Sequence, residues 1–347
     1  MAVKSLAVKY RPQTFDDVTE QSSVRTILQQ QLQGNEVKNA YLFCGGAGTG
    51  KTTCARIFAN EINKGQGNPI EMDAASHSGV DDVRGIIQQA KTKSLDSEYK
   101  VFIIDECHSI SNTGWQAFLK LIEEPPAKSI FIFCTTDPQK IPKTILSRVQ
   151  RYDFHRISQR GIVERLNYIC NEECITIPTI AVDSDYAHAL EYIAKIADGG
   201  MRDAITMLDK CLAYSKELTL DNVVTALGVA DYDTMMDLTD CLIKLDAAGV
   251  IQIIEELHSA GKDLKQFVRQ YMQFILDVNK YILRVPWEYM NIPRLEPYEK
   301  WLDMLHEDNI DYMNSLLSTL VNLNSEIKYS PSPKYDIEAR LMGGSYT

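Results

Sequence analysis

One short segment, residues 41–52, constrains the fold of this chain more than any other. It reads Tyr-Leu-Phe-Cys-Gly-Gly-Ala-Gly-Thr-Gly-Lys-Thr, and its last eight residues fit the phosphate-binding loop pattern. The apolar residues 41–44 predict a buried strand, and a helix is expected from about 52 to 63. Glycines let the backbone N–H groups face an anion, and the helix directs the positive end of its dipole there. The segment therefore predicts a polyphosphate-binding strand–loop–helix unit rather than a simple glycine turn.

This loop supplies most of the predicted nucleotide contacts. We expect the Lys51 ammonium to reach the β- and γ-phosphates and the Thr52 hydroxyl to bind Mg²⁺. The aromatic and proline residues at 10–12 either cover an adenine ring or pack as a tail on the core, and the residues alone leave both open. The candidates so far are Tyr10, Arg11, Pro12, Gly45, Gly46, Ala47, Gly48, Thr49, Gly50, Lys51, Thr52 and Thr53.

A second apolar run, residues 101–104, ends in Asp105 and Glu106. This pattern is typical of a buried parallel strand whose carboxyl end lies at a ligand site. Buried carboxylates without a cation would be costly. We therefore expect Asp105 to hold Mg²⁺ through water and Glu106 to orient and activate an attacking water.

Two polar residues near this strand give weaker signals. Thr136 follows the expected strand 129–134 and is a candidate contact to the γ-phosphate or the water, with a simple turn cap as the alternative. His108 is expected to be solvated or to cap a helix rather than to bind a ligand.

The order of expected elements predicts an α/β fold followed by helices. Strands alternate with helices through residues 1–157, which favours a three-layer domain with a parallel sheet. No sequence pattern typical of strands follows residue 158, and a small all-helical unit is expected at 158–222. Amphipathic helices continue through 223–347 and favour a bundle used for assembly.

Composition narrows the class of protein. Eight scattered cysteines suit reduced core thiols in a cytosolic protein, and Cys170 and Cys174 lack a second Cys/His pair at zinc-ligand spacing. No run of 18 apolar residues and no signal-peptide pattern occurs, so no membrane role is expected. The formal net charge is −11, but residues 223–347 hold 19 acidic and 11 basic residues whereas residues 1–222 hold 28 and 25. The first part can therefore still carry a DNA-facing surface.

Together, these segments resemble the gamma/tau-type ATPase subunit of the bacterial DNA polymerase III clamp loader, in the AAA+ class. The acidic helical remainder looks like the collar domain of that family, including Asp-Ile-Glu-Ala-Arg at 336–340. The resemblance implies a five-stranded parallel sheet, an all-helical lid and an all-helical collar. It rests on motifs at 9–15 (Lys-Tyr-Arg-Pro-Gln-Thr-Phe), 45–52, 73–76 (Asp-Ala-Ala-Ser), 104–108 (Ile-Asp-Glu-Cys-His), 122–126 (Ile-Glu-Glu-Pro-Pro), 135–142 (Thr-Thr-Asp-Pro-Gln-Lys-Ile-Pro), 145–148 (Ile-Leu-Ser-Arg) and 200–204 (Gly-Met-Arg-Asp-Ala).

The same resemblance implies a ring, expected to be a pentamer with other clamp-loader subunits, that binds ATP and Mg²⁺ at subunit interfaces. Arg148 would be the arginine finger that reaches a neighbour's site. Arg202 would be the sensor on the subunit's own nucleotide, although an arginine at a helix start is more often part of a surface ion pair. Ser76, Ser78 and Arg84 match positions that follow DNA phosphates, which gives recognition of shape rather than sequence; as residues alone they suit helix caps equally well.

The implied activity is ATP hydrolysis within a DNA-directed DNA polymerase holoenzyme. It would open a sliding clamp and load it onto primer–template DNA during replication, in the bacterial cytoplasm or in that of a bacterial host if the chain is virus-encoded. Two rival hypotheses are a hexameric AAA+ DNA motor of the branch-migration helicase type and a non-catalytic scaffold subunit of the same ring. A stand-alone metabolic kinase lacks any substrate-pocket signal.

The sequence departs from the family pattern in several places. Residues 60–69 form a short loop without cysteine where the family has a zinc module, so zinc is not expected. Ser-Arg-Cys is Ser-Arg-Val at 147–149, which should have no chemical effect. His77 and Gly79 replace basic residues before Arg84, which predicts weaker DNA contact. The chain is also expected to lack the polymerase-binding tail of the longer family form.

Overall fold

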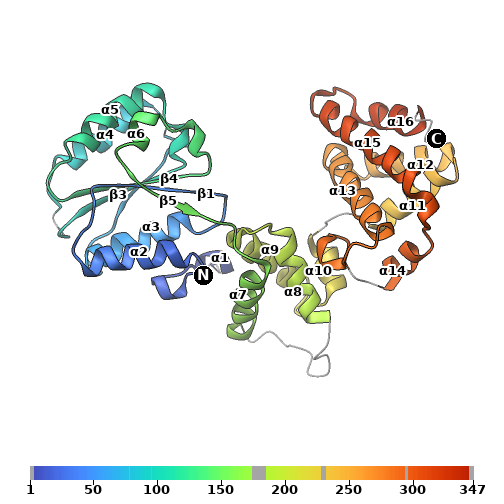
Figure 1. The fold of residues 1–347 in the computed structure, drawn as a ribbon, viewed down its shortest axis with the longest axis horizontal. Helices are drawn as coiled ribbons and strands as arrows, with labels where there is room; N and C mark the ends of the chain where they lie inside the picture. The colour runs from blue at the N-terminus through green and yellow to red at the C-terminus, as the bar shows by residue number, and fades with distance from the viewer. Residues whose placement is uncertain are drawn as a thin grey trace. The chain divides into compact units, whose positions relative to one another are not determined.

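The chain forms two compact units in the computed structural model (Figure 1). One comprises residues 1–176 and 193–210, and the other comprises 177–192 and 211–347. The predicted domain boundaries after residues 157 and 222 stay a prediction. Among the residues described, no helix combines the length and apolar composition that a membrane crossing requires. The structure describes residues 4–77, 79–94, 96–173, 185–227, 232–293 and 296–343.

A parallel sheet organises the first unit. Within the described part of that unit it has five strands in the order β2-β3-β4-β1-β5, which confirms the predicted α/β class. The carboxyl ends of β1 and β3 lie on the same edge with β4 between them, and such an edge is where open α/β sheets bind ligands. The strands are β1 (Ala40–Gly45), β2 (Ile70–Asp73), β3 (Lys100–Asp105), β4 (Ser129–Thr135) and β5 (Gln150–Phe154).

Helices cover both faces of this sheet because its central strands are apolar on both sides (Figure 1). Successive side chains of a strand point to opposite faces. Leu42 therefore packs with α4 (Val80–Ala90) and α5 (Asn112–Glu123), whereas Phe43 packs with α2 (Ser22–Gln33) and α3 (Lys51–Ile62). The helix that follows the phosphate loop, α3, is thus held in place by its packing against the sheet.

The remaining elements of the first unit connect the strands or lie before and after the sheet. The helix expected from about 52 to 63 is α3, which runs from Lys51 to Ile62. The short elements are α1 (Leu6–Lys9), α6 (Lys143–Leu146) and the 3₁₀ turns at Phe15–Asp17, Cys107–Ser109 and Pro138–Lys140. The long helices are α7 (Gln159–Glu172), α8 (Asp185–Ile196) and α9 (Met201–Tyr214), and α8 and α9 each continue into the second unit.

The second unit is all-helical over its described residues, as predicted. Its longest helix, α13, has an aromatic face of Phe267, Tyr271 and Phe274 that packs inside the unit. The buried carboxylate of Asp277 accepts hydrogen bonds from Lys280 Nζ (2.8 Å) and Asn291 N (2.6 Å), which ties the loop after α13 to that helix. The helices are α10 (Leu220–Leu227), α11 (Tyr232–Ile243), α12 (Ala247–Ser259), α13 (Leu264–Ile282), α14 (Glu296–Asp303), α15 (Ile310–Glu326) and α16 (Pro333–Gly343).

Candidate nucleotide-binding site

The phosphate loop owes its shape to glycines that no other residue can replace without strain. Gly45 (φ +154°), Gly48 (φ +69°) and Gly50 (φ +100°) all have positive φ. A Cβ at Gly45 would lie 2.4 Å from the carbonyl oxygen of Phe154 on β5. The carbonyl of Gly48 accepts a hydrogen bond from Met201 N at 3.0 Å, so the loop is joined to the start of α9.

Lys51 is a buried cation at the start of α3. Its side chain lies within the loop, where Nζ donates to the carbonyls of Gly45 (2.9 Å) and Gly46 (2.7 Å), and the residue is only 6% exposed. Burial lowers the pKa of Lys51. An ammonium group kept from water in this way gains most from an anion that enters the loop.

At the carboxyl end of β3 and the first turn of α3, a carboxylate and a hydroxyl group lie next to each other. Thr52 Oγ1 donates to Asp105 Oδ2 at 2.7 Å. Hydroxyl and carboxylate oxygens are hard ligands of the kind that Mg²⁺ prefers, so this donor set fits the predicted ion. Across the described residues, no group of three or more His, Cys, Asp or Glu side chains is arranged to hold a metal ion.

Glu106 lies directly after β3 in a left-handed conformation (φ 45°) and is held by neighbours from two elements. Its Oε2 accepts a hydrogen bond from Thr136 Oγ1 at 2.9 Å. The Nδ1 atom of His108 lies 3.3 Å from the same oxygen and 3.2 Å from Thr135 Oγ1. The expectation that His108 is solvated or caps a helix is therefore wrong, because its side chain, 19% exposed, lies against Glu106.

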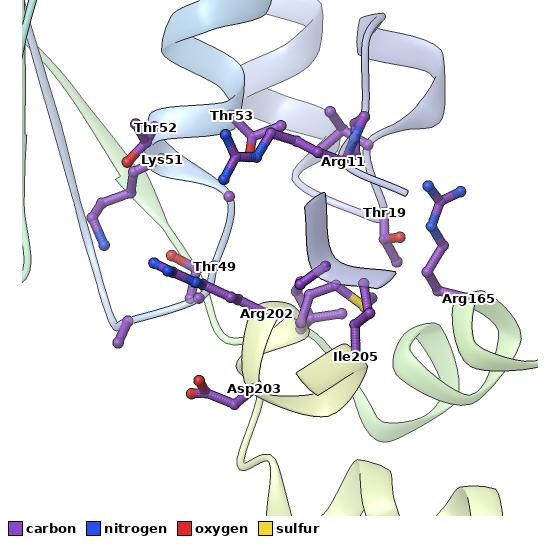
Figure 2. Close-up of a pocket in the computed structure, with 18 of the residues that line it drawn as sticks. Arg11, Thr19, Thr49, Lys51, Thr52, Thr53, Arg165, Arg202, Asp203 and Ile205 are labelled. Atoms are coloured by element: carbon purple, nitrogen blue, oxygen red, sulfur yellow. The ribbon is translucent and has the colours of Figure 1, made fainter. Parts of the chain in front are cut away.

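A pocket joins these groups to the N-terminal segment and to the helices after the sheet. Every predicted nucleotide-contact residue lines it except Gly45 and Gly46, whose carbonyls hold Lys51 instead, and Thr136, which donates to Glu106. Arg11, Lys51 and Arg202 reach the phosphate loop from three different elements (Figure 2). The lining residues are Ala7, Tyr10, Arg11, Pro12, Val18, Thr19, Ala47, Gly48, Thr49, Gly50, Lys51, Thr52, Thr53, Asp105, Glu106, Ile157, Arg165, Met201, Arg202, Asp203 and Ile205.

Arg165, on α7, is a pocket residue that the sequence analysis missed. Its NH2 donates to the carbonyl of Tyr10 at 2.8 Å, and its guanidinium lies 5.0 Å from the ring centre of Tyr168. At the C-terminal end of α7, Glu173 accepts hydrogen bonds from Tyr10 Oη (2.7 Å) and Lys9 Nζ (2.6 Å). Hydrogen bonds from Lys9 and Tyr10 lower the pKa of Glu173. No local sequence pattern separates these side chains from ordinary surface residues of a helix.

A second missed residue, Gln21, is buried behind the phosphate loop. Its Nε2 donates to the carbonyl of His155 at 2.7 Å and lies 3.4 Å from the carbonyl of Thr49, while its Oε1 accepts from His155 N at 3.2 Å. Both Glu20 and Gln21 have positive φ. Since neither is glycine, the sequence carries no signal for this turn.

Three other candidates are not among the residues that line the pocket. Arg148 Nε lies 2.8 Å from Glu123 Oε1 in a half-exposed ion pair. Ser76 Oγ donates to Asp73 at 3.2 Å, and the exposed Arg84 pairs with Asp81 at 2.9 Å. Ser78, the remaining DNA candidate, lies outside the described residues.

Comparisons with known proteins agree with this arrangement. Family models match three consecutive parts of the chain: DNA polymerase III, delta subunit, at 67–158; DNA polymerase III clamp loader subunit, ATPase lid domain, at 161–217; and DNA polymerase III subunits gamma and tau domain III, at 218–342. The solved structure of the Thermotoga maritima RuvB Holliday junction branch migration motor has 18% identity and a TM-score of 0.52, and the match covers 73% of this chain and 86% of that chain. This likeness confirms the AAA+ fold.

Sequence relatives point to one family. DNA polymerase III subunit tau of Bacillus subtilis is 32% identical over an alignment of 364 residues, gaps included, and the alignment covers 99% of this chain and 63% of the relative. DNA polymerase III subunit gamma/tau of Mycobacterium bovis is 34% identical over an alignment of 295 residues, gaps included, which covers 78% of this chain and 50% of the relative. The chain thus spans between half and two thirds of the length of these curated relatives. With three family models matching in order along it, the chain belongs to the gamma/tau-type family of DNA polymerase III clamp-loader subunits.

Proposed function

We propose that this chain is an ATP-hydrolysing subunit of a DNA sliding-clamp loader. The observation that carries the proposal is that Lys51, Thr52, Asp105 and Glu106 line one pocket in a chain of this family. A non-catalytic scaffold subunit would not need these four residues together. The branch-migration motor shares the AAA+ fold, but the match of residues 218–342 to the gamma and tau domain favours the clamp loader.

In the proposed site, the loop and Lys51 bind the β- and γ-phosphates, and Tyr10, Arg11 and Pro12 cover the base end of the nucleotide. Thr52 and Asp105 would hold Mg²⁺, since their side-chain oxygens lie 2.7 Å apart at the end of β3. When bound, Mg²⁺ would neutralise charge on the phosphate oxygens.

Glu106 acts as general base in this proposal. It accepts a proton from the water whose oxygen forms a bond to the γ-phosphorus, while the bond from phosphorus to the bridging oxygen breaks. Thr136 holds Glu106 and contacts the γ-phosphate or the water. Arg202 supplies positive charge from the same subunit and Arg148 from a neighbouring one, which makes hydrolysis depend on assembly.

The proposed assembly is a ring, a pentamer with other clamp-loader subunits, in which the helical second unit joins the subunits. ATP binding orders the ring so that it grips and opens a sliding clamp. Primer–template DNA, contacted along its phosphates by the region of Ser76, Ser78 and Arg84, then triggers hydrolysis and release of the closed clamp.

The test is the rate of ATP hydrolysis by the assembled loader, measured with and without primed DNA and with and without the sliding clamp of the same replication system. We expect the rate to rise when both are present, and Glu106→Gln to remove hydrolysis while ATP binding persists. A rate that neither DNA nor clamp changes would overturn the clamp-loader proposal. A wild-type rate no higher than that of Glu106→Gln would overturn the proposed ATPase activity itself.

A further inference from the structure

We propose that His108 is a positioning residue for Glu106, which it holds by one carboxylate oxygen so that the other faces the attacking water. The proposal rests on the function proposed above, because it assigns a task to a side chain beside the general base. His108 lies in the 3₁₀ turn Cys107–Ser109 that directly follows Glu106. The left-handed conformation of Glu106 reverses the chain there, and the side chains of residues 106 and 108 come together.

Two neighbouring threonines at the end of β4 divide the task of holding these groups. Thr136 Oγ1 donates directly to Glu106 Oε2 at 2.9 Å. Thr135 Oγ1 lies 3.2 Å from His108 Nδ1 and itself accepts a hydrogen bond from Asp137 N at 3.0 Å. The backbone after β4 therefore fixes Thr135, Thr135 fixes the imidazole, and the imidazole lies 3.3 Å from Glu106.

The position of the carboxylate selects the tautomer of the ring. A bare Nδ1 would place its lone pair 3.3 Å from the negative Glu106 Oε2, whereas a protonated Nδ1 donates to Thr135 Oγ1 and attracts that carboxylate oxygen. Nδ1 therefore carries a proton in this arrangement. Oε2 then faces two donors, because it accepts a hydrogen bond from Thr136 and lies 3.3 Å from the protonated Nδ1 of His108.

Two donors on one oxygen restrict the rotation of the Glu106 side chain. Oε2 is occupied, which leaves Oε1 to accept the proton of the water. A general base must lie within hydrogen-bond reach of the proton it removes, and a displacement of about 1 Å can cost on the order of 100-fold in rate. Loss of His108 should thus slow the chemical step without weakening nucleotide binding.

The decisive experiment compares His108→Ala, His108→Asn and His258→Ala in the assembled loader. Asparagine places an N–H donor near the position of Nδ1, alanine places none, and His258 is an exposed residue of α12 that serves as the control. We expect His108→Ala to lower kcat by about 10- to 100-fold. ATP affinity, measured with a fluorescent ATP analogue, should change less than twofold, and His108→Asn should recover most of the rate.

A second readout, on the nucleotide-free chain, does not depend on hydrolysis. Ring ¹⁵N signals of the six histidines can be recorded by NMR, and the signal lost in His108→Asn identifies His108. We expect a protonated Nδ1 whose shift changes in Glu106→Ala but not in Glu299→Ala, a variant of the second unit.

Each outcome decides one of the two proposals. A His108→Ala variant that is folded and hydrolyses ATP at the wild-type rate overturns the positioning role. An Nδ1 signal that Glu106→Ala leaves unchanged does so too. If instead the NMR contact is present and the wild-type loader hydrolyses no ATP, the proposed function fails while the contact between His108 and Glu106 stands.

Discussion

Arg148 and Glu123 form an ion pair in which Arg148 Nε lies 2.8 Å from Glu123 Oε1. The guanidinium also donates to the carbonyl of Thr144 at 2.8 Å, so it is held in a defined position outside the pocket of its own chain. Both charged side chains are about 40% exposed (39% and 40%), and exposed pairs contribute at most about 1 kcal/mol. Arg148 can therefore exchange Glu123 for a more strongly charged partner, such as the γ-phosphate of a neighbouring subunit.

This pair gives a prediction about catalysis between subunits. Arg148→Ala should retain ATP binding, and its hydrolysis rate should fall by about 10³-fold or more. An arginine finger usually raises kcat by at least this factor. Glu123→Gln, which removes only the resting partner, should change the rate little.

Mixing inactive subunits provides the control. An Arg148→Ala subunit has an intact nucleotide pocket but cannot supply an arginine to its neighbour. A Lys51→Ala subunit has a defective pocket but can still supply Arg148. A mixture of the two should therefore recover part of the activity, because a Lys51→Ala subunit can offer its Arg148 to an intact pocket. Failure of any mixture to exceed the separate variants would contradict action between subunits.

Removal of the buried ammonium of Lys51 should abolish the stabilisation that the nucleotide provides. ATP with Mg²⁺ at 100 times its Kd should stabilise the wild-type chain by about 2.7 kcal/mol and Lys51→Met not at all. Thermal unfolding with and without nucleotide measures this difference, and an equal shift of Tm in both proteins would contradict it.

The same residue makes a pH prediction for the nucleotide-free chain. Burial lowers the pKa of Lys51 in the folded chain below its ordinary value of 10.5. Between the two values the unfolded chain binds the extra proton, so the free energy of unfolding should rise as pH rises through that window. Lys51→Met should lack this rise, and parallel curves for the two proteins would count against the burial of a charged ammonium.

Two adjacent glycines of the loop should respond differently to the same substitution. Gly45→Ala places a Cβ 2.4 Å from the carbonyl oxygen of Phe154 at a φ of +154°, and we expect a loss of about 2 kcal/mol or more in the free energy of unfolding. Gly46→Ala has its nearest contact at 3.7 Å and serves as the matched control. Urea unfolding measures the free energy of unfolding of both variants. Equal losses would show that the close approach of β5 is not the reason why position 45 requires glycine.

The sheet and the phosphate loop could be predicted because their signals are local. A four-residue apolar run such as 101–104 is too short for a helix and favours a buried strand when helices flank it, and Gly-Lys-Thr after a strand has few other uses. The chemistry of Thr52 and Asp105 followed from the same motifs, and the structure brings the two together. Their binding of Mg²⁺ stays a prediction.

The contacts that could not be predicted are those set by tertiary geometry. A histidine after two carboxylates has no distinguishing pattern, so the sequence favours a solvated or helix-capping His108, whereas the left-handed turn at Glu106 brings this side chain back to the carboxylate. Gln21 reaches His155 because two non-glycine residues take positive φ, which sequence statistics disfavour. Arg165 meets Tyr10 across 155 residues of chain, a separation for which local periodicity carries no information.

Paired charges on α4 give a prediction about DNA. Arg84 is held by Asp81, one turn away, and both side chains are exposed. If Arg84 contacts a DNA phosphate, Arg84→Ala should weaken primer–template binding equally for all sequences and reduce the salt slope by about 1, whereas Asp81→Asn should strengthen binding. Fluorescence anisotropy across a salt series measures both. Variants that shift affinity in the same direction would argue against a phosphate contact.

The contacts around Tyr10 predict that α7 controls nucleotide affinity. Tyr10 is fixed twice to this helix, through its carbonyl to Arg165 and through its hydroxyl to Glu173, and it lines the pocket. Glu173→Gln weakens the charge-assisted hydrogen bond that Tyr10 makes. Part of the free energy of ATP binding is then used to order the segment around Tyr10, which covers the nucleotide. Since one hydrogen bond contributes about 1 kcal/mol, the Kd for ATP should rise about fivefold while kcat at saturating ATP stays within twofold of wild type.

The control variant is Glu172→Gln. It removes the same charge at a neighbouring exposed residue that does not contact Tyr10, and it should leave the Kd unchanged. Equal effects of the two variants would mean that charge, rather than the position of Tyr10, sets the affinity.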